Sequence, residues 1–329
     1  MAVDPSVDVA SALWYCESGR IELRQEPIAA PEADEVRVRT LYSAVSRGTE
    51  SLVFGGRIPA SEFERMRAPF MTGRFPFPVK YGYSAVGQVE HAEGRLQGKN
   101  VFALFPHQTL FNVRSTAVLV LPEDVPPKRA VLTANMETAL NGVWDAAPGP
   151  ADRIAVVGAG VVGSLVAYLC GRIPGTDVTL VDINPDREEL ATKLGVHFRE
   201  PGSAPRDCDL VVHASGSPDG LRTALELAGD EATVLEMSWY GDTPVTTLLG
   251  GPFHSRRLRL VSSQVGQVAA SHRPRWTYGR RLAAAAALLV DPRLDELLAP
   301  PIPFKDLPKL LPEVLAARSG VLCQPIAYQ

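Results

Sequence analysis

Residues 153–163 read Arg-Ile-Ala-Val-Val-Gly-Ala-Gly-Val-Val-Gly, and this stretch decides the fold. A short apolar run leads directly into the pattern G-x-G-x-x-G, and a helix is predicted to follow over residues 164–171. The first glycine permits a tight turn, the second lets the backbone approach a pyrophosphate, and the third lets the helix pack closely on the strand. The stretch therefore predicts a dinucleotide site at the N-terminus of the helix. The predicted binding residues of this turn are Gly158, Ala159, Gly160, Val161, Val162 and Gly163.

The next predicted strand, residues 178–181, ends in an acidic residue, Asp182. It lies about 20 residues beyond the last glycine, where a carboxylate can accept hydrogen bonds from an adenosine ribose. Because a 2′-phosphate would place negative charge against this carboxylate, NAD is the expected cofactor. Arg187 lies close by in the sequence and leaves NADP possible. Ile183 and Arg187 are included in the predicted cofactor site.

Strand-like runs alternate with helical stretches through the middle of the chain, which is typical of parallel βαβ units. This block is therefore predicted to be a doubly wound parallel sheet. Ser238, Trp239 and Tyr240 follow the strand predicted over 233–235, at the edge where open α/β sheets bind ligands. Ser238 and Trp239 are included in the predicted cofactor site, and Trp239 and Tyr240 are predicted to line the nicotinamide pocket. The alternative for this segment is a dimer surface. The predicted strands cover residues 154–157, 178–181, 210–212, 233–235 and 258–262.

The segments on either side differ from this block. Residues 12–120 contain short apolar runs separated by Gly and Pro, which predicts a mostly β region, and a helix is predicted over 129–145. Helices over 278–290 and 307–317 and a strand over 322–326 are predicted to complete the chain. A nucleotide-binding domain of residues 128–266 is thus expected to be inserted into a β-rich domain formed by 1–127 and 267–329.

Composition limits the classes of function. A chain of 329 residues exceeds one hydrophobic core, and 46% hydrophobic with 21% charged residues excludes a disordered protein. The formal net charge of −4 carries no electrostatic signature of binding to nucleic acid or to an anionic membrane. The expected partner is therefore a small-molecule substrate.

The cysteines and the start of the chain bear on location. The four cysteines are scattered without a C-x-x-C pair, which favours reduced thiols rather than a disulfide framework or metal site. Residues Met1 to Pro5 lack the basic and apolar regions of a secretory signal, and no apolar run is long enough to span a bilayer. We therefore expect a cytoplasmic protein.

Two further segments carry a family resemblance. Residues 78–89 resemble the P-x-x-P-G-H-E-x-x-G-x-V segment of the medium-chain dehydrogenase/reductase superfamily, and residues 209–216 resemble its fourth nucleotide-domain strand. The resemblance covers nearly the whole chain. It implies an α/β fold in which a GroES-like β-rich catalytic domain is joined to a Rossmann domain, and it implies a homodimer formed through the nucleotide domain. It also places Ala214, Ser215 and Gly216 in the cofactor site.

The chain departs from the zinc enzymes of that superfamily at their metal ligands. Ser46 stands at the cysteine position, and Tyr83 and Ser84 replace the histidine and glutamate of the G-H-E segment. Residues 133–138, where the zinc enzymes have a further ligand, offer Asn135 and Glu137 but no thiolate or imidazole. Zinc sites need several thiolate, imidazole or carboxylate ligands. The sequence therefore predicts no zinc and no other metal.

Without a Lewis acid, a protein group must move the hydroxyl proton during hydride transfer. Tyr83 and His107 are the leading candidates, with Lys80 as the cation that would lower the pKa of the phenol. His107 is expected at a strand end that faces the cleft. Glu50 and Ser46 complete the predicted set, although Glu50 is expected to anchor a loop or Arg47. The alternatives are that Tyr83 only fills the vacated metal pocket and that His107 is a turn histidine bonded to backbone.

The segment 46–50, Ser-Arg-Gly-Thr-Glu, resembles a bacterial branch named zinc-binding alcohol dehydrogenase and the bacteriochlorophyllide hydroxyethyl dehydrogenase. This resemblance implies that a hydride moves between nicotinamide and a secondary alcohol or ketone. Two alternatives stay open: an NADPH-dependent enoyl or quinone reductase, and a dinucleotide-binding protein without turnover.

Overall fold

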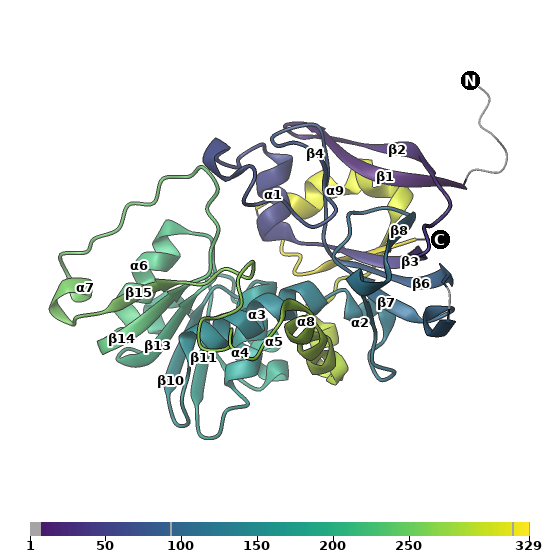
Figure 1. Ribbon diagram of the computed structural model, residues 1–329. Coiled ribbons are helices and arrows are strands. Elements are labelled where there is room, and N and C mark those ends of the chain that lie inside the picture. Colours follow the sequence, from purple (N-terminus) through teal and green to yellow (C-terminus); the bar gives the residue numbers. More distant parts are fainter. Residues whose placement is uncertain (1–7, 93, 318, 329) are drawn as a thin grey trace. The chain divides into compact units, whose positions relative to one another are not determined.

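The computed structural model describes residues 8–92, 94–317 and 319–328, and it divides into two compact units (Figure 1). The β-rich unit comprises Met1–Ala134, Ala286–Val290 and Leu298–Gln329, and the Rossmann unit comprises Asn135–Ala285 and Asp291–Leu297. Residues 1–5, on which the expected location partly rests, lie outside the described residues.

The β-rich unit is built from two sheets, as the apolar runs between Gly and Pro turns predicted. Within the described residues, one sheet has the strand order β2-β1-β5-β4, and the other has the order β16-β17-β3-β6-β7-β9 with β8 also paired to β3. Its strands are β1 (Asp8–Glu17), β2 (Arg20–Ile28), β3 (Glu35–Val45), β4 (Thr72–Gly73), β5 (Val79–Lys80), β6 (Ala85–His91), β7 (Asn100–Ala103), β8 (Leu110–Arg114), β9 (Val118–Val120), β16 (Ile302–Pro303) and β17 (Gln324–Ala327), and its helices are α1 (Arg47–Phe54), α2 (Pro127–Ala130) and α9 (Leu307–Leu315).

The Rossmann unit contains a parallel sheet whose order, in the part of the chain that the structure describes, is β12-β11-β10-β13-β14-β15. This confirms the predicted doubly wound sheet. The short strand β12 was not predicted, because Phe198 is its only apolar residue. The strands are β10 (Arg153–Val157), β11 (Asp177–Val181), β12 (His197–Arg199), β13 (Cys208–His213), β14 (Ala228–Glu236) and β15 (Arg259–Ser262), and the helices are α3 (Thr133–Ala146), α4 (Val161–Cys170), α5 (Arg187–Leu194), α6 (Pro218–Leu227), α7 (Pro252–Ser255) and α8 (Tyr278–Ala287).

The core of the Rossmann unit explains its continuous apolar strands. Residues 154–157 of β10 are all buried, as expected for a strand covered on both faces. Helix α4 packs against β10 and β11, while α6 packs against β10, β13 and β14. Leu221 and Leu225 of α6 join Val211 of β13 in one cluster of buried residues. These helices hold the carboxyl ends of the strands in place, which is where the glycine turn lies.

Two boundaries differ from the sequence predictions. In place of the single helix expected over 129–145, the structure has two helices, α2, which ends at Ala130, and α3, which begins at Thr133. The Thr133 hydroxyl donates to the Ala130 carbonyl at 2.6 Å. The chain returns to the β-rich unit near Ala286 rather than at residue 267. The reason is Arg281 of α8, which is buried and bonds to α3 through an ion pair with Glu137 at 3.0 Å. This pair joins α8 to α3, so most of α8 is grouped with the Rossmann unit.

None of the helices within the described residues has the length and apolar character that a membrane span requires.

Candidate active site

The glycine turn follows β10 directly, and each of its three positions is occupied by glycine for a different physical reason. Gly158 has a φ of +108°, and a Cβ there would lie 2.6 Å from the backbone nitrogen of Ser215. A Cβ on Gly163 would lie 1.9 Å from the Gly158 carbonyl oxygen, so α4 could not pack so closely with any side chain. A Cβ on Gly160 would meet nothing within 4 Å. The protein itself therefore does not require Gly160, whereas a ligand approaching the backbone would.

Asp182 follows β11 and lies beside this turn. The Ala159 N–H donates to its Oδ2 at 2.7 Å, and the Asn184 N–H donates to its Oδ1 at 2.9 Å. The carboxylate is thus held at the glycine turn by backbone amides, where an adenosine ribose would reach it. Ile183 is 82% exposed beside it, and Arg187 begins α5. The structure brings these predicted cofactor residues together at one edge of the sheet.

The ends of β13 and β14 lie at the same edge. Ala214, Ser215 and Gly216 follow β13, and Ser238 follows β14. The Gly216 N–H donates to the Ser238 Oγ at 3.0 Å, so the two loops are tied together, and the partly buried Trp239 comes next. The prediction from sequence did not include His213 and Glu236, which end β13 and β14. An ionisable residue at the end of each of two buried strands was the available signal.

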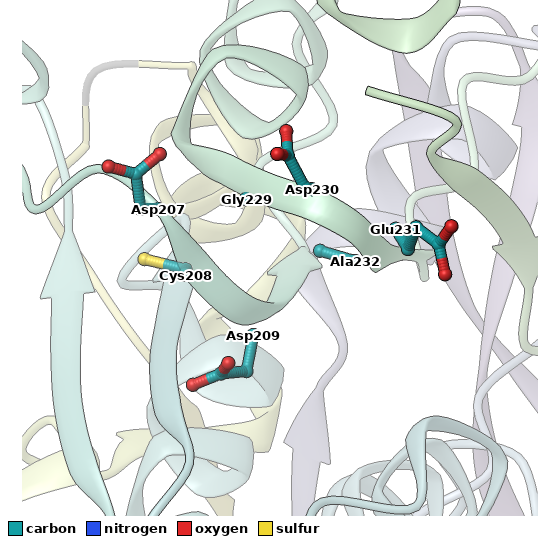
Figure 2. A pocket seen from close by; sticks show the side chains of 7 residues that line it. All are labelled: Asp207, Cys208, Asp209, Gly229, Asp230, Glu231 and Ala232. Carbon is teal, nitrogen blue, oxygen red and sulfur yellow. The ribbon is translucent and has the colours of Figure 1, made fainter.

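The amino-terminal ends of these strands, opposite the glycine turn, carry an open pocket of about 390 Å³, lined by the residues in Figure 2. Its acidic side chains, on Asp207, Asp209, Asp230 and Glu231, point in different directions rather than toward a common point (Figure 2). The pocket lies at the amino ends of β13 and β14, away from the glycine turn. Ligands of open parallel sheets bind at the carboxyl ends, so this pocket is not the candidate site.

In the β-rich unit, Tyr83 and Ser46 lie together as their sequence positions predicted. The Tyr83 hydroxyl donates to the Ser46 Oγ at 2.5 Å and lies 3.2 Å from the Thr49 Oγ1. Burial raises the pKa of the Tyr83 phenol, the bonds to Ser46 and Thr49 lower it, and the charge of Glu50 raises it, for a net increase. Tyr83 is therefore protonated at neutral pH and can act as a proton donor.

Glu50 and His107 form a buried pair behind these hydroxyls. Both side chains have no exposed surface, and the His107 Nε2 lies 3.0 Å from the Glu50 Oε2. The other ring nitrogen of His107 lies 2.8 Å from the Ser43 Oγ. Glu50 also accepts from the Tyr15 hydroxyl at 2.6 Å and from the Ser46 N–H at 2.7 Å. The prediction that His107 faces the cleft is wrong, because Gly82 packs directly over its ring.

Two predicted partnerships are also corrected. The Lys80 Nζ donates to Glu26 at 2.6 Å and to the Gln108 side chain at 2.8 Å, so this ammonium serves those groups rather than Tyr83. Arg47, expected as a partner of Glu50, instead donates to backbone carbonyls of the C-terminal segment, among them that of Val314 at 2.9 Å. Glu50 anchors the loop, as expected, but through His107 and backbone.

The donors at this place do not fit the zinc ion that the resemblance would imply. They are the hydroxyls of Ser46, Thr49 and Tyr83, whereas zinc sites use thiolate, imidazole and carboxylate ligands. The neighbouring imidazole of His107 and carboxylate of Glu50 are buried and paired with each other. Ser84 donates to the Val131 carbonyl, and Glu137 is held by Arg281. Among residues 8–92, 94–317 and 319–328, no three His, Cys, Asp or Glu side chains are grouped as a metal site would require.

Comparisons with known sequences find dehydrogenases, although no family model matches the chain. The (R,R)-butanediol dehydrogenase of Bacillus subtilis is 23% identical over 251 residues, which cover 67% of this chain and 70% of that protein. The L-threonine 3-dehydrogenase of Ruegeria pomeroyi is 28% identical over 141 residues, or 42% of this chain and 39% of that protein.

Solved structures share the fold over nearly the full length. A candidate zinc-binding dehydrogenase from Sinorhizobium meliloti, bound to NADP, has a TM-score of 0.77 at 16% identity and covers 97% of this chain and 99% of its own. An alcohol dehydrogenase from Escherichia coli, in complex with NADH, has a TM-score of 0.74 at 17% identity with the same coverage. The fold is thus a GroES-like domain with a Rossmann domain, and the sequence relatives named above are dehydrogenases.

Proposed function

We propose that this protein is an NAD(H)-dependent, zinc-independent oxidoreductase that interconverts a secondary alcohol and a ketone. The observation that carries the proposal is the glycine turn, in which Gly160 faces open space while Asp182 is held beside it by the Ala159 amide. The butanediol and threonine dehydrogenases among its relatives support an alcohol as the substrate class.

A nicotinamide dinucleotide supplies the hydride acceptor or donor when it is bound. The turn 158–163 and the first residues of helix α4 would direct N–H groups toward the pyrophosphate of the dinucleotide. Asp182 would lie at its ribose. The negative charge of Asp182 favours NAD, while Arg187 leaves room for NADP. The neighbours with NADP and with NADH support a nicotinamide cofactor without deciding between the two.

Tyr83 is proposed to move the proton. Its raised pKa keeps the phenol protonated, so it would donate to the substrate oxygen as the ketone is reduced. Ser46, at 2.5 Å, accepts from Tyr83 in the free protein, and the substrate oxygen would take over this bond from the phenol. Glu50 and His107 do not touch the substrate in this proposal, because both are fully buried. They position Ser46 through the bond from its N–H to Glu50.

The test begins with a panel of secondary alcohols, ketones, enones and quinones assayed with both nicotinamide cofactors. With an alcohol or ketone identified, Tyr83→Phe is expected to lower kcat about 100-fold, as for loss of a general acid. Tyr42→Phe is the matched control, since it removes a phenol hydroxyl elsewhere in the same unit. Full turnover by Tyr83→Phe would refute the role of Tyr83, and activity only on enones or quinones with NADPH would refute the reaction class.

The zinc-free proposal has its own measurement. Elemental analysis of purified, active protein is expected to find zinc far below one equivalent per chain, and activity is expected to survive dialysis against a chelator. Stoichiometric zinc whose removal abolishes turnover would contradict the proposal.

A homodimer through the Rossmann unit is also proposed. Among the described residues, β15 pairs only with β14, so its other edge is free, and Leu260 and Val261 are 39% and 40% exposed there. An unpaired strand edge is a template for pairing with a second copy. Sedimentation is expected to give a dimer, and Leu260→Lys is expected to weaken it. A monomer at all concentrations would contradict this assembly.

A further inference from the structure

The ends of β13 and β14 hold a chain of hydrogen bonds around a buried histidine. His213 and Glu236 are register partners in the parallel sheet, and the His213 side chain has no exposed surface. The His213 Nδ1 lies 2.9 and 2.8 Å from the two carboxylate oxygens of Glu236. Its Nε2 lies 2.6 Å from the Ser215 Oγ. Both ring nitrogens thus have partners, and the ring orientation is fixed.

The protonation of Glu236 determines which way these bonds run. Burial acts to raise the pKa of Glu236, but the contacts with His213 and Ser238 outweigh it and lower the pKa below its usual value. The ionised carboxylate only accepts, so an imidazole that carries one proton must carry it on Nδ1. Nε2 is then an acceptor, and the Ser215 hydroxyl donates to it. The Tyr240 hydroxyl and the Ser238 N–H also donate to Glu236, at 2.9 and 2.7 Å.

Ser215 lies at the predicted cofactor site, because its backbone packs against Gly158 of the glycine turn. The residue is exposed, and its Oγ also accepts from the Ser217 N–H at 3.2 Å. A hydroxyl has one hydrogen and two lone pairs. In Ser215 the hydrogen goes to His213 and one lone pair is taken by Ser217, so one lone pair remains for an incoming donor.

We propose that His213, held by Glu236, is a positioning residue that makes Ser215 present a lone pair to a ribose hydroxyl of the bound dinucleotide. The inference rests on the proposed function. A phosphate oxygen only accepts and could not bond to this lone pair, whereas a ribose hydroxyl can donate. Because the hydroxyl is already oriented, less rotational freedom is lost when the dinucleotide binds.

The same Ser–His–Glu order occurs in serine hydrolases, but the geometry here does not favour acyl transfer. Such enzymes need free N–H donors to stabilise an oxyanion beside the nucleophile. The two amides that follow Ser215 are already used within the loops, since Gly216 donates to Ser238 and Ser217 donates to Ser215 itself. A role in orienting a ligand agrees with these contacts.

A double-mutant cycle on dinucleotide affinity tests the inference, with NADH as the probe in calorimetry on the full chain. Ser215→Ala is expected to raise Kd about fivefold, the usual effect of losing one hydrogen bond. If His213 acts through Ser215, His213→Phe raises Kd by a similar factor, and the double variant binds no worse than Ser215→Ala. Ser217→Ala is the matched control, because its hydroxyl caps no amide of α6.

Ser215→Thr keeps the hydroxyl and is expected to bind within about twofold of the unaltered protein. Because Ser215 is exposed, the comparison of Ser215→Thr with Ser215→Ala tests the role of the hydroxyl even if His213→Phe fails to fold. Unchanged affinity in Ser215→Ala, or losses that multiply in the double variant, would overturn the positioning role. Absence of NADH and NAD binding by the unaltered protein would instead overturn the proposed function on which the inference rests.

Discussion

Replacing Gly160 with alanine separates the demands of the fold from those of the cofactor. The added Cβ meets no protein atom within 4 Å, and the φ of −74° is allowed for any residue. The expected loss of stability is therefore only about 0.5–1 kcal/mol, the difference between glycine and alanine at an N-cap. A methyl group between the backbone and a pyrophosphate is expected to weaken dinucleotide binding at least about tenfold, or about 1.4 kcal/mol.

Gly163→Ala should behave in the opposite way. Its Cβ would lie 1.9 Å from the Gly158 carbonyl oxygen, so α4 must shift, and overpacking of this kind costs about 1–3 kcal/mol or more. For both variants, thermal unfolding measures the loss of stability and calorimetry with NADH measures the loss of dinucleotide affinity. Gly202→Ala, whose Cβ also meets nothing, is the control away from the turn. Unchanged NADH affinity in a folded Gly160→Ala protein would refute the assignment of a dinucleotide to this turn.

Three further predictions concern charged side chains of the Rossmann unit. Asp182→Asn keeps the shape but not the charge, so the ratio of NAD to NADP affinity is expected to fall about tenfold in paired titrations, whereas an unchanged ratio would exclude Asp182 as the selector. Arg281→Met leaves Glu137 buried without its cation and is expected to cost about 3–5 kcal/mol in denaturant unfolding, whereas a loss below about 1 kcal/mol would contradict the importance of this pair. The folded pKa of Glu236 is lowered, so its contribution to stability is full above the unfolded value of about 4.3 and is lost as the pH falls further. Glu236→Gln should therefore be less stable than the unaltered protein at about pH 7, with a smaller difference at about pH 3, and an equal difference at both would refute the linkage.

Much of the Rossmann unit could be predicted from the sequence, because its signals are local. The apolar run, the spacing of Gly158, Gly160 and Gly163, and the acidic end of the next strand each depend on a few neighbouring residues. The position of Ser46 beside Tyr83 could also be predicted, but only through the resemblance to a family with ligands at both places.

The partners of ionisable side chains could not be predicted, because strand register and packing decide them. Glu50 and His107 are 57 residues apart, and Lys80 and Glu26 are 54 apart, so nothing in the local sequence distinguishes these pairs from others. His107 was expected in a cleft, and the close approach of Gly82 instead buries it.

The tertiary structure alone decided the hydrogen-bond network at the carboxyl ends of β13 and β14. His213 and Glu236 are 23 residues apart, and they meet because parallel pairing of β13 and β14 places both strand ends in register. Sequence by itself determined that a glycine turn leads from β10 into α4 and which residue types surround it. Which of those residues share a proton, and which are merely buried, follows from the sheet that brings them within hydrogen-bond distance.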